Sequence, residues 1–238
     1  MSSPYGLEFV ESCLGCKLPG KEFFCYLPHA SLPALEKVRF PNLLPKGSTL
    51  YVTHQKANGV YLICIGNVKV WTTGPDGRVL ILKIAGPGEV LGLHACVSGT
   101  AHEFTAETVQ PSQVAFVKSE DFLSLLRSDP AACWRAAHIL SRQCRESYDF
   151  LRTMGQKRSA SEKLAGFMLD LAFTWQSQSN GTGVHVGFTH EELGRAIGVS
   201  RETVWRILSK FRSAGVAVLQ GSMLNIQNPE ALRRLAGR

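Results

Sequence analysis

The chain has 238 residues, enough for one large domain or two modest domains that each bury a core. Hydrophobic residues make up 45% of it and charged residues 19%, and no run approaches about 18 consecutive apolar residues, so we expect a globular protein that has no contact with a membrane. The N-terminus lacks the basic-then-apolar pattern of an export signal, and we therefore expect a cytoplasmic location.

The net charge of +7 is unevenly distributed along the chain. Residues 152–238 hold 12 Lys and Arg against 6 Asp and Glu, whereas residues 1–151 hold 14 against 13. A basic excess attracts phosphate groups without selecting a sequence, although a basic surface alone identifies no partner. The charge therefore matters only where it coincides with a motif.

Three cysteines lie in the N-terminal segment, residues 1–30. Cys13 and Cys16 form a C-x2-C pair, and Cys25 follows. A C-x2-C turn can place two thiolates on one soft metal, either zinc or the iron of an iron–sulfur cluster. Three thiols are one too few for a closed site, so unliganded thiols remain the alternative. Seven cysteines, an odd number, in a chain without an export signal argue against a disulfide framework.

Residues 31–118 are predicted to form short strands between glycine turns, after a short helix over residues 32–37. Val60, Leu62 and Cys64 alternate as in a strand with one buried face, and Pro75-Asp76-Gly77 is typical of a hairpin turn. Strands spaced about every ten residues favour a small antiparallel barrel or a double-sheet roll.

A long helix is predicted from Asp129-Pro130 to about Gly155, because Asp129 can cap it and Pro130 suits its first position. Its apolar residues recur every three or four positions, which favours a seam against a second copy of the helix over an intradomain core position. The predicted seam comprises Ala137, Leu140, Cys144, Tyr148, Leu151 and Met154.

A further helix is expected to begin at Ser159 or Ser161 and to open the C-terminal domain. Its apolar face would comprise Leu164, Phe167, Met168, Leu171 and Phe173. The polar run SQSNGTG that follows is a loop by composition.

Residues 189–215 are predicted to form a helix-turn-helix. Thr189 and Ser200 can each cap a helix, and Gly198 suits the tight turn between them. The two helices would bury one stripe each against the other, made of Leu193, Ile197, Val199, Val204, Ile207, Leu208 and Phe211.

The exposed face of the second helix would carry Arg201, Glu202, Trp205 and Arg206. An Arg can donate two hydrogen bonds to O6 and N7 of guanine, and a Glu can accept one from N4 of cytosine. This face could therefore discriminate bases in a major groove. VAVLQ and MLNIQ, separated by a Gly-Ser turn, predict a two-stranded wing, and Asn228-Pro229 starts a last short helix that carries Arg233 and Arg234.

RETVWRIL after G-x-S, followed by F-x-x-x-G and a two-stranded wing, resembles the recognition element of the CRP/FNR family of transcription regulators. The resemblance implies an α+β protein with a cysteine-containing segment (1–30), a β-roll sensor domain of the cyclic-nucleotide-binding type (31–128), a dimerisation helix (129–156) and a winged helix-turn-helix (157–238). It further implies a homodimer on a near-palindromic operator with TGTGA-type half-sites, with RNA polymerase as a partner. The expected DNA-binding residues are Thr189, Ser200, Arg201, Glu202, Thr203, Trp205 and Arg206.

The oxygen-sensing branch of the family holds a [4Fe-4S] cluster through N-terminal cysteines and one distant cysteine. By that resemblance Cys13, Cys16 and Cys25 would be ligands, but the distal position is Ala115 here. Cys96, which we expect in a loop, could replace it, and Cys64 is a second choice.

Family members that bind cyclic nucleotides carry a Glu for the ribose and an Arg for the phosphate. Leu93 and Phe104 occupy those positions here, so we expect no cAMP binding. His94, His102 and Cys96 leave haem open as an alternative ligand. We expect no enzyme, because the chain contains no nucleophile elbow, P-loop lysine, HExxH motif or recognisable carboxylate pair.

Overall fold

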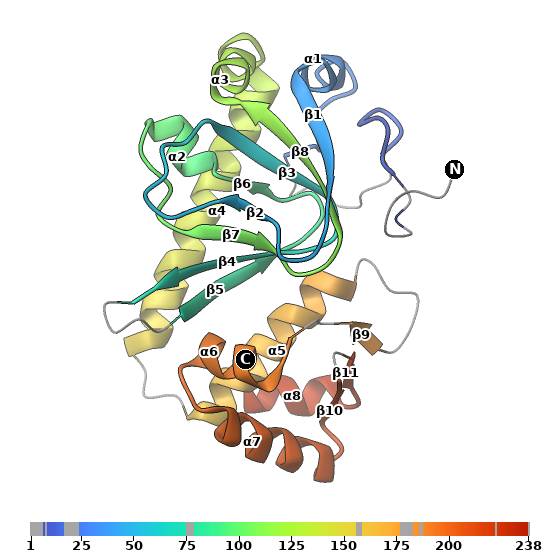
Figure 1. Ribbon diagram of the computed structural model, residues 1–238, viewed down its shortest axis with the longest axis vertical. Helices are drawn as coiled ribbons and strands as arrows, with labels where there is room; N and C mark the ends of the chain where they lie inside the picture. The colour runs from blue at the N-terminus through green and yellow to red at the C-terminus, as the bar shows by residue number, and fades with distance from the viewer. Residues whose placement is uncertain are drawn as a thin grey trace. The chain divides into compact units, whose positions relative to one another are not determined.

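A computed structural model of the chain describes residues 7, 9–16, 24–74, 79–155, 159–176, 183–185, 188–221 and 223–237 (Figure 1). For residues 149–155, 173–176 and 183–185 it describes the backbone only. The chain divides into two compact units, Met1–Val70 with Ala85–Phe150 and Trp71–Ile84 with Leu151–Arg238. Within the described parts, no helix combines the length and the apolar character needed to cross a membrane.

Two four-stranded sheets form the β-roll. In strand order, the first contains β1 (Arg39–Leu44), β8 (Ser112–Lys118), β3 (Gly59–Ile65) and β6 (Val90–Leu91). The second contains β2 (Thr49–Tyr51), β7 (Thr105–Thr108), β4 (Val68–Thr73) and β5 (Val79–Ala85). The pairs β1–β8, β3–β8, β3–β6 and β2–β7 are antiparallel, which confirms the predicted double-sheet roll. The predicted turn Pro75-Asp76-Gly77 lies outside the described residues.

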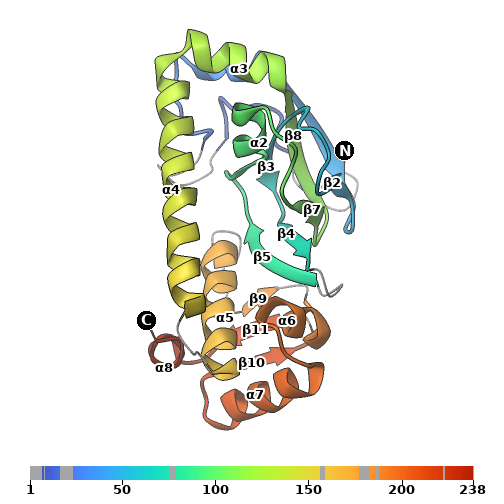
Figure 2. The same ribbon diagram turned by 90° about the vertical axis from the view of Figure 1, so that its left-hand side faces the viewer.

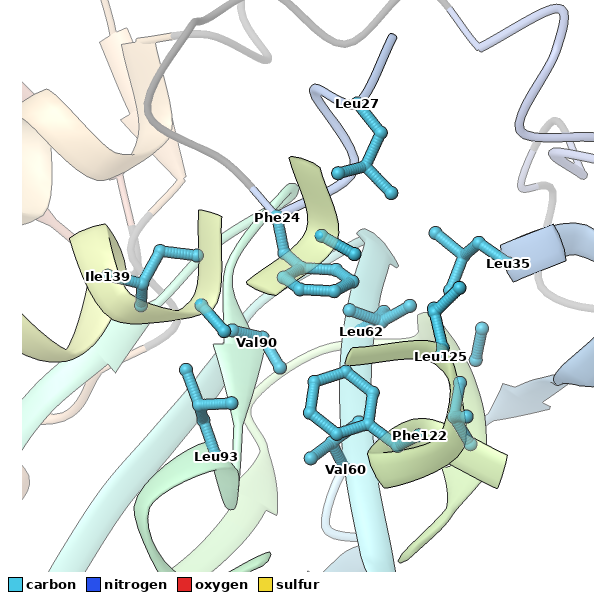
Figure 3. Packing of buried hydrophobic residues seen from close by; sticks show 14 of the residues in the cluster. Phe24, Leu27, Leu35, Val60, Leu62, Val90, Leu93, Phe122, Leu125 and Ile139 are labelled. Carbon is cyan, nitrogen blue, oxygen red and sulfur yellow. The ribbon is translucent and has the colours of Figure 1, made fainter. Parts of the chain in front are cut away.

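The core of the roll lies between the first sheet and the helices that cover it (Figure 3). Phe24, Val60, Leu93, Phe122 and Ile139 come from five separate segments of the chain and are all buried in this one cluster. Burial of side chains of this size stabilises the fold by about 1.5–3 kcal/mol each. The cluster therefore holds α1 (Leu32–Val38), α3 (Ser119–Ser128) and α4 (Pro130–Gly155) around the sheet.

The prediction that Cys96 lies in a loop is wrong. Leu93–Ser98 form the short helix α2, which starts after Gly92 and ends at Gly99, both in the left-handed region with φ of 76° and 72°. A six-residue segment between two glycines is too short to be stable as an isolated helix, so the sequence pattern indicates a loop. The burial of Leu93, Ala95 and Cys96 against the roll stabilises the helix.

The long helix α4 begins as predicted. Oδ1 of Asp129 accepts hydrogen bonds from the backbone N–H groups of Ala131 at 2.9 Å and Ala132 at 3.2 Å, so Asp129 caps the helix. Figure 2 shows α4 running beside the sheet that contains β3, with α3 lying across its N-terminal end. Its inward side buries Ala132, Ala136 and Ile139.

The C-terminal part contains α5 (Ala160–Gln176), α6 (His190–Ile197), α7 (Arg201–Ser213) and α8 (Pro229–Leu235). Ser159 caps α5, since its Oγ accepts from the backbone N–H of Glu162 at 3.2 Å. β9 (Gly183–His185), β10 (Ala217–Gln220) and β11 (Met223–Ile226) form a sheet of order β10-β11-β9. The predicted two-stranded wing therefore has a third strand, β9. The polar run SQSNGTG, which leads into β9, did not predict this strand.

Candidate functional site

Helix α6 is fixed at both ends by the residues predicted for that purpose. Thr189 Oγ1 accepts from the backbone N–H of Glu192 at 3.2 Å, and Glu192 Oε2 accepts from the backbone N–H of Thr189 at 2.8 Å. This reciprocal capping box satisfies two N–H groups that the helix leaves without partners. At the other end Gly198 has a φ of 74°, which a side chain rarely adopts, and its N–H bonds the carbonyl of Gly194.

The turn between α6 and α7 depends on a second glycine that the sequence pattern did not single out. A Cβ added at Gly194 would lie 2.6 Å from the carbonyl oxygen of Val199. Only glycine therefore lets the backbone of the turn pass this close to α6. The contact sets where α7 begins. Of the seven predicted stripe residues Val199 is half-buried, and the other six are buried: Leu193, Ile197, Val204, Ile207, Leu208 and Phe211.

Ser200 caps the start of helix α7, since its Oγ accepts from the backbone N–H of Thr203 at 3.3 Å. The first two turns of the helix present Arg201, Glu202, Trp205 and Arg206 to solvent, and Trp205 is 60% exposed.

Glu202 is held in its charged form. Its own backbone N–H and the side chain of Ser200 lower the pKa of the carboxyl group. A carboxylate accepts hydrogen bonds only, which suits the exocyclic amine of cytosine, whereas the neighbouring guanidinium groups suit guanine or phosphate. The start of α7 thus carries donors and an acceptor on one exposed surface.

Helix α4 exposes a stripe that matches the predicted seam in part. Trp134 is 73% exposed and Tyr148 is 67% exposed, and between them Ala137 and Cys144 are exposed too. Positions three and four apart share a face of a helix, so these four residues form one stripe. Trp134 was not among the predicted seam residues, although its spacing to Ala137 would have placed it there.

One predicted seam residue, Leu140, does not belong to the exposed stripe. Leu140 is half-buried and packs against the core cluster of the roll, which places it on the flank of the stripe. The side chains of Leu151 and Met154 lie outside the described residues.

The N-terminal segment is tied to the roll by hydrogen bonds. Gln113 on β8, fully buried, donates through Nε2 to the carbonyl of Val10 and accepts through Oε1 from its N–H, both at 2.8 Å. The N–H of Cys13 donates to Oε2 of Glu36 at 2.7 Å, and Nη2 of Arg39 donates to the carbonyl of Glu11. These contacts fix the backbone that leads to the C-x2-C pair.

Phe24 anchors the other end of the segment. It is fully buried, and its ring lies 5.2 Å from that of Phe122 on α3 (Figure 3). Between and beside these two anchors, Cys13 and Cys25 pack against the core cluster of the roll.

The three N-terminal thiols are half-buried, and Cys64 on β3 is buried. Burial raises the pKa of Cys13 to about 12 and that of Cys64 to about 11, and the charge of Arg39 opposes both shifts. In the absence of a bound metal ion, the thiols of Cys13 and Cys64 are therefore protonated at neutral pH. Among the described residues no three Cys, His, Asp or Glu side chains are arranged as ligands of a single metal ion.

Cys96 lies elsewhere. Its Sγ is 3.5 Å from Oγ of Ser119, and burial raises its pKa, with only Ser119 opposing. None of the three N-terminal cysteines influences it. Cys64, the second choice from the sequence, and Cys96 both belong to the core cluster against which Cys13 and Cys25 pack, so this packing does not choose between them.

The residues at the expected nucleotide positions face different surroundings. Leu93 is buried in the core cluster, and Phe104 is partly exposed. His102 is buried and stacks on Tyr51 with ring centroids 3.8 Å apart, and burial lowers its pKa. His94, the other histidine considered for haem, is exposed, with Nδ1 4.0 Å from a carboxylate oxygen of Glu103.

Residues 41–129 match the cyclic nucleotide-binding domain family, and residues 162–235 match the Crp-like helix-turn-helix domain family. The chain is 26% identical over 208 residues to the CRP-like cAMP-activated global transcriptional regulator of Mycobacterium tuberculosis, covering 87% of this chain and 92% of that protein. It is 25% identical over 195 residues to the fumarate and nitrate reduction regulatory protein of Escherichia coli, covering 82% and 77%.

Solved structures agree with this pairing. The CRP-family transcriptional regulator TTHB099 from Thermus thermophilus has a TM-score of 0.69 at 27% identity, covering 83% of this chain and 97% of that one. FixK2 from Bradyrhizobium japonicum has a TM-score of 0.73 at 24% identity with the same coverage, and shows the same fold.

Proposed function

We propose that this chain, which belongs to the CRP/FNR family of transcription regulators, binds its operator as a homodimer and contacts base edges through Arg201, Glu202 and Arg206. The observation that carries the proposal is the outward presentation of these three side chains at the capped start of α7. In helix-turn-helix proteins the first residues of the second helix are those that contact base edges. Thr189, Ser200, Thr203 and Trp205 complete the proposed surface.

The dimer follows from the exposed stripe on α4. Two copies that meet along Trp134, Ala137, Cys144 and Tyr148 would bury two large aromatic side chains each. A two-fold axis along such a seam pairs the two α7 helices on half-sites about 34 Å apart, which requires a near-palindromic operator. By the family resemblance we propose TGTGA-type half-sites and RNA polymerase as a partner.

The DNA contacts are tested by selecting operators from random duplexes with the wild-type chain and with Arg206→Ala. Loss of one bidentate contact should cost about 1–3 kcal/mol and relax the preference at one base pair of each half-site. Arg212→Ala is the matched control, because it removes the same charge from an exposed position in the last turn of α7. It should leave the preferred sequence unchanged. An unchanged preference in Arg206→Ala would refute the base contact.

We further propose that the signal is redox or oxygen, received through a metal or [4Fe-4S] site on Cys13, Cys16 and Cys25. The anchored segment supports this, since hydrogen bonds at Val10 and Cys13 tie it to the roll and Cys13 and Cys25 pack against the core cluster. The donor set also fits, because soft thiolates bind iron–sulfur clusters and zinc. When bound, a cluster would supply an oxygen-sensitive link between the segment and the roll, and Cys13, Cys16 and Cys25 would hold it.

Cyclic AMP is not proposed as the signal. No Lys or Arg occurs between Lys83 and Lys118, which spans the segment where family members neutralise the cyclic phosphate. Leu93 faces the core and cannot accept a hydrogen bond from ribose. Isothermal titration with cAMP should show no binding, and micromolar affinity would overturn this part of the proposal.

The metal is tested by purifying the chain without oxygen. A brown protein that contains iron and sulfide and bleaches in air indicates a cluster, whereas a colourless protein with stoichiometric zinc indicates a structural metal. Cys16→Ser should lose the metal, and, for a cluster, the oxygen dependence of DNA affinity. Full metal content in Cys16→Ser would exclude this site.

A further inference from the structure

His102 is a buried histidine whose backbone is fixed and whose ring lacks a full set of hydrogen bonds. The residue is 2% exposed. Its carbonyl accepts from the N–H of His54 at 2.7 Å, and its N–H donates to the carbonyl of Gln55 at 2.9 Å. Within the described residues, Nε2 of the ring has no hydrogen-bond partner. Because both backbone groups are bonded, the side chain is the part of His102 that can respond to a change in its charge.

Two residues hold the ring of His102 in place. It stacks on the ring of Tyr51 from β2, with centroids 3.8 Å apart and planes inclined by 14°. Gly92 lies close to it as well, since a Cβ added to Gly92 would meet Cε1 of His102 at 3.0 Å. The phenolic oxygen of Tyr51 in turn accepts a hydrogen bond from the N–H of Gly92. Each of the three residues therefore lies against the other two, and we refer to Tyr51, His102 and Gly92 as the clasp.

The clasp fixes the start of α2. The N–H of Gly92 is bonded to Tyr51, and the carbonyl of Gly92 accepts from the N–H of Cys96 inside the helix at 2.9 Å. One residue thus ties α2 to β2. Figure 3 shows Leu93 of α2 and Ile139 of α4 in the core cluster that the two helices share. A shift of Gly92 would therefore disturb packing that α2 has in common with α4.

The clasp favours the neutral form of His102. A neutral imidazole has one N–H and the protonated ring has two, and an N–H without a partner in a buried site is costly. Burial accordingly lowers the pKa of His102 below its usual value of 6.5. The attraction of a cation to the face of Tyr51 opposes this cost. That attraction leaves Nε2 unbonded, however, whereas exposure of the ring to water would satisfy both nitrogens.

The charged and titratable groups around the clasp do not compensate a proton on His102. Burial is the only cause of its lowered pKa, so no neighbouring charge raises it. The nearest carboxylate in sequence, Glu103, instead lies 4.0 Å from Nδ1 of His94, and both of these side chains are exposed. The titratable groups on the segments packed against the clasp are Tyr51, His54, Lys56, Tyr61, His94 and Glu103.

We propose that the clasp is a proton-sensitive switch in which uptake of a proton by His102 drives its ring away from Tyr51 and loosens α2 from the roll. The proton comes from water, and its loss closes the clasp again. Because the folded chain disfavours the protonated ring, the packing of α2 is fully stable above pH 6.5 and weakens as the pH falls through the lowered pKa of His102. Acidity would thus be a second signal, and its path through α4 to DNA rests on the proposed dimer.

The switch is tested on the full chain by amide hydrogen exchange and by NMR titration of the His102 ring. The reporter is the amide of Cys96, which donates to Gly92, and protection factors correct for the intrinsic effect of pH on exchange. Amides of β8 report unfolding of the whole roll. Tyr51→Phe keeps the stacked ring but removes the acceptor of the Gly92 N–H, so it opens the clasp without a proton.

Two substitutions remove the titrating group. His102→Phe keeps a ring on Tyr51 and takes up no proton, and His102→Gln replaces it if phenylalanine does not fold. His94→Gln is the matched control, because it removes an exposed histidine from α2 itself.

In the wild type and in His94→Gln, the protection factor of Cys96 should fall at least about tenfold between about pH 7.5 and about pH 5, the factor that corresponds to one unit of pKa, while β8 stays protected. It should stay constant in both His102 variants and be low at both pH values in Tyr51→Phe. An equal fall in a folded His102 variant, an equal loss of protection in β8, or a His102 ring that titrates at or above pH 6.5 overturns the switch.

Operator affinity connects the switch to function. It should fall together with the protection of Cys96 in the wild type and stay constant in His102→Phe. Constant affinity while Cys96 loses protection overturns the role of acidity as a signal. The clasp is closed at about pH 7.5, so operator binding at that pH tests the proposed function separately. A wild-type chain that binds no operator there overturns the proposed function, whereas the exchange of Cys96 still decides whether the clasp opens.

Discussion

The side-chain amide of Gln113 forms two hydrogen bonds of 2.8 Å with the backbone of Val10, 103 positions earlier in the chain. Gln113 thereby satisfies both the N–H and the carbonyl of Val10, as a neighbouring strand would. The amide is fully buried, so water cannot replace these bonds, and both partners depend on the pairing. This contact decides where the segment with Cys13 and Cys16 meets the roll.

Replacing Gln113 with leucine should release the segment while leaving the strand in place. Removal of both hydrogen bonds should lower the free energy of unfolding by about 1–3 kcal/mol and speed hydrogen exchange of the Val10 amide. Chemical denaturation and amide exchange measure the two effects. Gln110→Leu is the control, because Gln110 donates to Oδ1 of Asn67 at 2.9 Å and not to the segment. Equal protection of Val10 in wild type and Gln113→Leu would contradict the anchoring role.

Glycine at position 194 should be indispensable for the helix-turn-helix. In Gly194→Ala the new methyl group would meet the carbonyl oxygen of Val199 at 2.6 Å, so the turn must move. We expect a loss of about 1–3 kcal/mol in stability, as for other overpacked sites, together with weaker operator binding. Gly166→Ala, inside α5 with no atom within 4 Å of the added Cβ, should instead gain about 0.5–1 kcal/mol. Thermal unfolding distinguishes the two, and similar shifts in both variants would argue against a steric cause.

The helix-turn-helix could be predicted from the sequence because its signals are local. Thr189 and Glu192 are three residues apart, and the buried residues of α6 and α7 follow one period, so a short window contains everything that fixes these helices. The cap at Asp129 is local in the same sense.

Features that depend on distant contacts were missed. Helix α2 exists because Leu93 and Cys96 are buried against the roll, and β9 exists because β11 pairs with it. Trp134 differs, since its helical spacing to Ala137 and Tyr148 is a local signal that the sequence contains.

The exposed stripe on α4 should determine the oligomeric state. Trp134→Glu places a charge where an indole that is 73% exposed in the single chain would be buried against a second copy, so we expect a monomer. Sedimentation equilibrium measures the mass, and operator affinity should fall with dimer formation. Glu146→Ala, on another face of α4, should leave the dimer intact. A dimer of wild-type stability in Trp134→Glu would place the interface elsewhere.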